Sequence, residues 1–153
     1  MRISSMFFPH VTVAAVIEKD GKFLMVEETI GGLAVINQPA GHLEDNESLV
    51  DAVKREVLEE TAWEFKPRHL LGVYRWPQPE KDRTWLRFNF TGEAVRDTGR
   101  ALDPDIDRAL WLPEQEIAAL QQSGKLRSPQ VWQAMRDYRA GKQYPLDLLA
   151  DLV

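Results

Sequence analysis

The sequence has no cysteine among its 153 residues. Disulfide bonds are therefore excluded, and a structural zinc site, which usually relies on thiolates, is not expected. No apolar run approaches the roughly 20 residues that a membrane-spanning helix needs. The first nine residues lack the apolar core and the small-residue cleavage site of a signal peptide. We therefore expect a protein of the reducing cytoplasm that has no membrane partner.

Positive charge is also scarce. The chain has 19 Lys and Arg against 24 Asp and Glu, which gives a formal net charge of −5. Nucleic-acid binding depends on neutralising phosphates with Lys and Arg, so a nucleic-acid partner is not expected. A small polyphosphate stays compatible with this charge, because a bound metal ion can reverse the local sign of the field. We expect a small-molecule substrate and a chain that is a monomer or a homodimer.

The remaining composition is that of an ordinary globular protein, with 44% apolar and 28% charged residues. The length suits one domain over residues 1–153, and we find no internal repeat or long linker. A chain of this size buries roughly 70% of its unfolded surface, so it needs no covalent staple to fold.

The first part of the chain predicts strands. Val11–Ile17 and Lys22–Glu28 are apolar runs on either side of Asp20-Gly21, a pair typical of a tight hairpin. A third strand is expected at Leu33–Ile36, and the composition of residues 37–41 predicts a loop.

The rest of the chain alternates helices and strands. Residues 47–60 predict a helix, because apolar residues recur on one face of it. Three later segments are expected to be strands: Leu70–Trp76, Trp85–Val95 and Arg108–Leu112. Pro113 is expected to open a helix that runs to Gln122, and Ser128-Pro129 to cap and start another that ends at Gly141. This mixture predicts an α/β fold, a sheet covered by helices on both faces.

Three acidic residues stand out near the end of the helix predicted over residues 47–60. Glu56, Glu59 and Glu60 share one side of it, next to the apolar face. Like charges at these spacings cost about 0.2–0.5 kcal/mol per pair, and the helix dipole disfavours anions in the last turn. A solvated acidic patch is the plain alternative. However, several energetically unfavourable charges at one place in a helix indicate a functional site.

A hard divalent cation would compensate this clustering. Carboxylate oxygens suit Mg²⁺, which is often shared with substrate phosphates, and such an ion can polarise a phosphoryl oxygen and activate water. Gly41 precedes the helix and would let the backbone approach an ion or ligand closely, although it could equally be a simple loop glycine.

The segment from Gly41 to Trp63 resembles the signature motif of the Nudix hydrolases. The matching residues are Gly41, Glu47, Arg55, Glu56, Val57, Glu59 and Glu60. One position departs from the motif, because Ala62 stands where the family has a glycine. A left-handed backbone at Ala62 would cost about 1 kcal/mol. Segments outside the motif, such as residues 37–44, 105–107 and 126–129, resemble the bacterial NudJ-type phosphatases of this family.

The resemblance implies an α/β/α sandwich with a mixed β-sheet, and a Mg²⁺-dependent hydrolase in which Mn²⁺ could substitute. The implied bonds are phosphoanhydrides of nucleoside di- and triphosphates, or of thiamine and pyrimidine pyrophosphates. By position, the implied metal ligands are the carboxylates of Glu56 and Glu60 and the backbone carbonyl of Gly41. Glu59 would be a further ligand or would orient water. Arg55 and Glu47 would brace the catalytic loop and helix.

Other residues are candidates for binding substrate. Arg87 alternates away from Phe88 on its predicted strand and could hold a phosphate. Gln38 could hydrogen-bond the substrate, although a role in a turn is as reasonable. Resemblance to the family also suggests an acid from a later loop, for which Asp105 is the first candidate and Asp107 the second.

The aromatic and histidine residues are assigned less sharply. Trp76 and Trp85 flank a charged loop, and we expect partly buried packing more than stacking on a substrate ring. His10 and His69 are expected to be structural, and His42 could touch phosphate or stay solvated.

Two other functions remain open at this point. One is a ligand-sensing domain that kept the fold without catalysis, which the complete acid set disfavours. The other is a pyrophosphohydrolase of RNA 5′ ends, which the acidic net charge disfavours.

Overall fold

The computed structural model describes residues 6–153. These residues form a seven-stranded mixed sheet centred on β1 (His10–Lys19). β1 runs parallel to β6 (Arg83–Asp97) and antiparallel to β4 (Ala40–His42) and β2 (Lys22–Ile30). The other strands extend the sheet on its two sides: β3 (Leu33–Asn37) and β7 (Arg108–Pro113) pair with β2, and β5 (Trp63–Gln78) pairs with β6.

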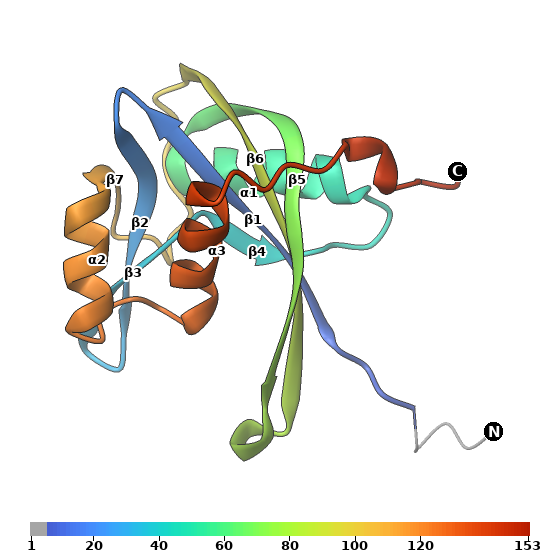
Figure 1. The fold of residues 1–153 in the computed structure, drawn as a ribbon, viewed down its shortest axis with the longest axis horizontal. Helices are drawn as coiled ribbons and strands as arrows, with labels where there is room; N and C mark the ends of the chain where they lie inside the picture. Colours follow the sequence, from blue (N-terminus) through green and yellow to red (C-terminus); the bar gives the residue numbers. More distant parts are fainter. Residues whose placement is uncertain (1–5) are drawn as a thin grey trace.

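Helices cover both faces of this sheet, as predicted. In β1, Val13, Ala15 and Ile17 belong to a core with α1 (Leu49–Thr61). The alternate residue Val16 belongs to a second core with α2 (Glu114–Gln122) and α3 (Pro129–Arg139). In Figure 1, α1 lies behind the sheet and α3 in front of it. This two-sided burial follows from the strand period of two, and it confirms the predicted α/β/α sandwich.

The predicted turns are present. Asp20 and Gly21 join β1 to β2 with φ values of 52° and 78°, and Gly31 and Gly32 join β2 to β3 with φ values of 58° and 81°. These left-handed values explain why glycine recurs at the two turns.

Two strand predictions were incomplete. Residues 37–41 were expected to be a loop, but Ala40 and Gly41 begin β4, where Gly41 pairs with Val13 of β1. Strand β5 starts at Trp63, well before the predicted Leu70, and its pairing with β6 passes through three irregularities. Both strands depend on partners that are distant in the sequence, so local composition did not reveal them.

The helix starts also differ in detail. α1 begins at Leu49, because the Oγ of Ser48 accepts a hydrogen bond from the Asp51 N–H (3.0 Å) as its N-cap. Glu47 therefore lies just outside the helix. Pro113 is the N-cap of α2 instead of its first residue. Ser128 holds the N-cap position of α3, but its side chain makes no capping bond.

Within residues 6–153 no helix is long and apolar enough to cross a membrane.

Ala62 ends α1 in a left-handed conformation, with φ 67° and ψ 2°. Its N–H donates to the Leu58 carbonyl (2.9 Å). Its own carbonyl accepts hydrogen bonds from the backbone N–H (2.9 Å) and the hydroxyl (2.6 Å) of Thr98. The position therefore keeps the backbone expected where the family motif has glycine, and Thr98 holds it there against the steric cost of a Cβ.

We expect Ala62→Gly to change the free energy of unfolding by less than about 1 kcal/mol, because relief of strain offsets the loss of one buried methyl. Ala62→Val should destabilise by about 2 kcal/mol or more, since a β-branched side chain is strongly disfavoured at positive φ. Urea unfolding of both variants measures this contrast. Equal stability of the Gly and Val variants would contradict it.

Candidate active site

A cleft of about 400 Å³ lies beside β4. Its walls come from β1, β4, β6, the end of β2, the loop before β7 and the first residues of α3. Four residues singled out from the sequence line it: Gly41, Glu60, Arg87 and Asp105. Of the predicted acidic cluster on α1, Glu60 lines this cleft, whereas Glu56 and Glu59 do not.

Glu56 packs directly on Gly41. The side chain is only 8% exposed. A Cβ built on Gly41 would overlap the carboxyl group of Glu56, so any larger residue at position 41 would have to displace that carboxyl. Burial raises the pKa of Glu56, although the ion pair with Arg55 opposes the effect. The close approach inferred for Gly41 is therefore present, and the group approached is a carboxylate.

Glu60 lies one turn further along α1 and is 7% exposed. Its Oε1 accepts a hydrogen bond from the backbone N–H of Ala40 in β4 (2.9 Å). Burial raises the pKa of Glu60 to about 8, and the nearby charges of Glu56, Glu28 and Asp103 act in the same direction. This carboxyl thus occupies a place where ionisation is unfavourable unless a cation arrives.

Arg55 connects the loop before α1 to the acidic cluster. Its guanidinium binds both carboxylate oxygens of Glu47 (2.7 and 2.9 Å) and the carbonyl of His42 (3.0 Å). Its Nη1 also reaches Glu56 (2.8 Å) and Glu59 (3.2 Å). The hydrogen bonds from Arg55 lower the pKa of Glu47. The bidentate pair holds the loop against the helix in the arrangement that the resemblance implied.

The acidic side chains are not close enough together, as they stand, to coordinate a metal ion. Among residues 6–153, no three His, Asp or Glu side chains form a group that could hold a metal ion as they stand. Arg55 accounts for this, because it neutralises Glu56 and Glu59 in place of a cation. The donors nevertheless suit a hard ion in kind, since they are all carboxylate oxygens, with Glu56 and Glu60 buried and Glu59 partly exposed.

Arg87 lies in the wall of the cleft with 7% of its surface exposed. Its only hydrogen bonds within the described residues are long ones to Thr12 Oγ1 and Gln38 Oε1, both 3.4 Å. Burial lowers the pKa of Arg87 to about 10, so the side chain stays charged at neutral pH. The charges of Glu60 and Glu28 favour the charged form of Arg87, but no carboxylate in residues 6–153 forms an ion pair with it, so an anion that enters the cleft would find an available partner.

Gln38 does not reach the cleft. Its amide nitrogen donates to Asn89 Oδ1 (2.7 Å) and to the Ala15 carbonyl (3.1 Å), and its oxygen accepts from Arg87. The structure therefore places Gln38 beneath Arg87, as a support for the guanidinium.

The loop before β7 contributes the acid expected first, Asp105, and a second acid that was not predicted, Asp103. Asp105 lines the cleft, but so does Asp103, whose charge acts on both Glu56 and Glu60. The backbone N–H of Asp103 donates to the Glu59 carbonyl (2.8 Å), which ties the loop to α1. Asp107 accepts a hydrogen bond from Thr29 (2.6 Å) and does not line the cleft. The Asp103-Pro104-Asp105 turn was the available signal for Asp103.

Aromatic side chains form another part of the cleft wall. Trp76 and Trp85 both line the cleft. Trp85 donates to Gln78 (2.7 Å) and packs against His10 and His42, with ring centroids 4.9 and 5.6 Å away. His10 is therefore structural, and the ring of His42 lies at the edge of the cleft. Stacking of either tryptophan on a substrate ring stays a prediction.

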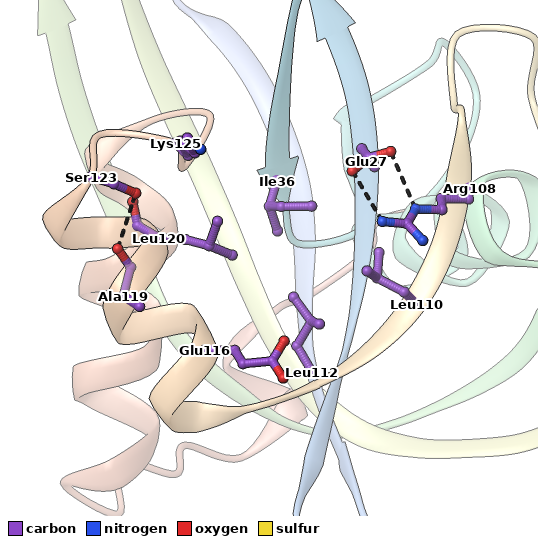
Figure 2. Close-up of a pocket in the computed structure, with 10 residues that line it drawn as sticks. All are labelled: Glu27, Ile36, Arg108, Leu110, Leu112, Glu116, Ala119, Leu120, Ser123 and Lys125. Carbon is purple, nitrogen blue, oxygen red and sulfur yellow. Dashed lines mark hydrogen bonds and ion pairs between the residues drawn. The ribbon is translucent and has the colours of Figure 1, made fainter.

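A second hollow, of about 350 Å³, lies between α2 and the strands β2, β3 and β7 (Figure 2). Its centre is apolar, formed by Ile36, Leu110, Leu112 and Leu120. At its rim Glu27 and Arg108 already form an ion pair (3.2 Å). None of the predicted site residues lines this second hollow, whereas Gly41, Glu60, Arg87 and Asp105 line the cleft beside β4.

Comparison with known proteins agrees with this geometry. A model of the NUDIX domain matches residues 6–133. The chain is 46% identical over 147 residues to Phosphatase NudJ of Escherichia coli (strain K12), which covers 95% of this chain and 94% of that protein.

Two solved structures illustrate the similarity of fold. A NUDIX hydrolase from Nitrosomonas europaea is 50% identical, with a TM-score of 0.90 over 95% of this chain and 98% of that one. The NUDIX domain of Shewanella oneidensis NrtR, complexed with ADP ribose, has a TM-score of 0.73 over 92% of this chain and 93% of that one. At 16% identity it shares the fold alone. Because the sequence match spans nearly the whole length on both sides, the chain belongs to the Nudix hydrolase family.

Proposed function

We propose that this Nudix hydrolase uses Mg²⁺, or Mn²⁺ in its place, to cleave a phosphoanhydride bond in a small diphosphate or triphosphate. The candidate substrates are nucleoside di- and triphosphates and the pyrophosphates of thiamine or its pyrimidine precursor. The similarity to Phosphatase NudJ supports a phosphatase of this kind. The cytoplasmic location and the monomeric or homodimeric state stay predictions.

One observation carries the proposal: two carboxyl groups, those of Glu56 and Glu60, are buried close together, and within residues 6–153 only that of Glu56 is in an ion pair. Arg55 reaches Glu56, but Glu60 has only the Ala40 N–H. Unpaired buried carboxyl groups are costly, so proteins keep them where a ligand compensates for them. A divalent cation would match this charge.

The residues that would hold the ion are Glu56, Glu60 and the carbonyl of Gly41, with Glu59 as a further ligand or as the group that orients water. When bound, a divalent ion would polarise a phosphoryl oxygen and promote attack by water. Arg55 would release part of its contact with Glu56 and Glu59 as the ion enters. Its bidentate pair with Glu47 would keep the loop of Gly41 in position meanwhile.

Substrate phosphate would be held by Arg87. Its guanidinium is buried and is oriented by Gln38 and Thr12. Little reorganisation is therefore needed when an anion binds. In-line attack on phosphorus requires positioning and charge neutralisation above all, and these residues supply both. Asp103 and Asp105 offer an additional acid from the facing loop.

A substrate screen tests the function directly. The full chain is incubated with Mg²⁺ or Mn²⁺ and with nucleoside di- and triphosphates, thiamine pyrophosphate and its pyrimidine precursor, and each product is identified. We expect release of phosphate or pyrophosphate that stops on addition of EDTA. Tight binding of nucleotide ligands without any turnover would instead favour the ligand-sensing alternative. Turnover confined to triphosphate-ended RNA would favour the second alternative.

Glu60→Gln should lower the turnover rate at least about 10²-fold at saturating Mg²⁺, because even outer-shell changes at metal sites cost about 10–100-fold. The same variant should be more stable than the parent chain in EDTA at pH 8.5, by on the order of 2 kcal/mol. Glutamine keeps an oxygen for the Ala40 N–H, but it cannot ionise. Steady-state kinetics and urea unfolding measure the two effects.

The sign of the stability effect follows from the raised pKa. The pKa of Glu60 rises from 4.5 to about 8 on folding, so its contribution is complete below pH 4.5 and is lost as the pH rises through about 8. The gain from Glu60→Gln should therefore be small at pH 5 and larger at pH 8.5. The exposed Glu80→Gln serves as control and should change neither activity nor stability. An inactive Glu60→Gln variant that is also less stable at pH 8.5 would contradict the assignment.

Gly41→Ala tests the close approach of β4 to Glu56. The added methyl must displace the Glu56 carboxyl, so metal-dependent activity should fall at least about tenfold. Stability should change little, because only a side chain has to move. Gly72→Ala is the matched control, since its methyl would meet only the ring of Tyr74 at 3.2–3.3 Å. Full activity of Gly41→Ala in limiting Mg²⁺ would refute the role of Gly41.

A further inference from the structure

The first turn of α3 forms part of the wall of the cleft. Ser128 and Gln130 both line the cleft at this point. The turn has no side-chain cap and no acidic residue, so its partial positive charge is left uncompensated. This alone would not make a site, because many helices start without a cap.

Gln130 supplies an independent observation. It is only 5% exposed, and its Nε2 is buried without a hydrogen-bond partner among the described residues. The hydroxyl of Ser128 lies 3.4 Å from the Oε1 of the same amide, so the nitrogen end is left for a group outside the protein. An unsatisfied buried N–H donor costs about 1–3 kcal/mol, which a ligand acceptor would recover.

A second buried amide lies close by. The backbone N–H of Arg127 donates to the Ile36 carbonyl (2.8 Å), which ties the segment before α3 to the end of β3, where Asn37 lies. Asn37 lines the cleft, and its Oδ1 is also buried without a partner. Asn37 therefore presents an acceptor at this point and is not counted among the donors of this wall.

Two arginines give this wall a positive charge. Arg127 lines the cleft beside Arg87, close enough for each charge to act on the other. Arg127 has a partial partner in Glu28 at 3.4 Å, whereas Arg87 has no carboxylate partner within the described residues. Two guanidinium groups facing one space favour an anion between them.

We infer that the start of α3 is a phosphoryl-binding subsite, in which Gln130 and Arg127 act together with Arg87. The ligand is a tetrahedral phosphoryl group, whose several acceptor oxygens match amide, backbone and guanidinium donors together. Glu60 lines the same cleft and its charge acts on Arg87, but the donors of the subsite are amide and guanidinium groups, so it binds its phosphoryl group without a divalent ion. The inference rests on the proposed function for its place in catalysis, where it holds the phosphoryl group that the metal does not.

Binding of inorganic phosphate to the full chain in EDTA tests the subsite. Titration followed by two-dimensional ¹H–¹⁵N NMR should shift the backbone amides of Ser128, Gln130 and Val131 and the side-chain amide of Gln130. Gln130→Glu should weaken phosphate binding at least about tenfold, because it replaces a donor to a charged group with a second anion. Gln130→Met should weaken it similarly while leaving thermal stability unchanged or higher, since it removes an unsatisfied buried amide.

Gln122→Glu is the matched control. Gln122 is exposed at the end of α2, and its substitution changes the net charge by the same amount. Phosphate affinity should stay at the parent value in this variant. Equal phosphate affinity in Gln130→Glu and the parent chain would overturn the subsite. So would shifts confined to other parts of the chain, or phosphate binding that requires Mg²⁺.

The hydrolysis screen separates this inference from the proposed function. If phosphate binds at α3 in EDTA but no substrate is hydrolysed with Mg²⁺ or Mn²⁺, the subsite stands and the proposed function fails. If hydrolysis proceeds but phosphate does not perturb α3, the proposed function stands and the subsite fails.

Discussion

The structure around the cleft depends on the packing of Glu56 onto Gly41. Two buried carboxyl groups at the end of α1 face the short strand β4, and only a residue without a side chain allows that approach. The resulting repulsion is tolerated because Arg55 and one backbone N–H share the negative charge. Part of the negative charge is therefore left without an ion-pair partner among residues 6–153, as the raised pKa of Glu60 reflects.

Much of the surrounding fold serves to hold this arrangement in place. β4 pairs with the central strand, the Arg55–Glu47 pair fixes the loop between β4 and α1, and Thr98 clamps the far end of α1. Ala62 keeps a left-handed backbone although glycine usually occupies such positions, and the hydrogen bonds from Thr98 stabilise this conformation. A rigid frame is what a site built from mutually repelling groups requires.

The sequence predicted what depends on local pattern. The acidic side of α1, the hairpin at Asp20-Gly21 and the placement of Arg87 and Phe88 on opposite faces of β6 all follow from spacing or alternation within one segment. Sequence-based prediction failed where an element depends on a partner that is distant in the chain. β4 exists only because β1 lies beside it, and Asp103 acts on Glu60 across a loop that no local rule positions. Tertiary pairing decided those cases, as it does for most short strands.

Gln38 and Gln130 give a second example of what local sequence pattern cannot predict. Gln38 precedes the motif and invited a role in substrate binding, whereas Gln130 had no distinguishing neighbour except the start of a helix. In the folded chain the amide of Gln38 is satisfied at both ends by protein atoms, while the nitrogen of Gln130 is buried without a partner. Residue type was identical, so only the position of surrounding donors and acceptors separates a supporting residue from one that awaits a ligand.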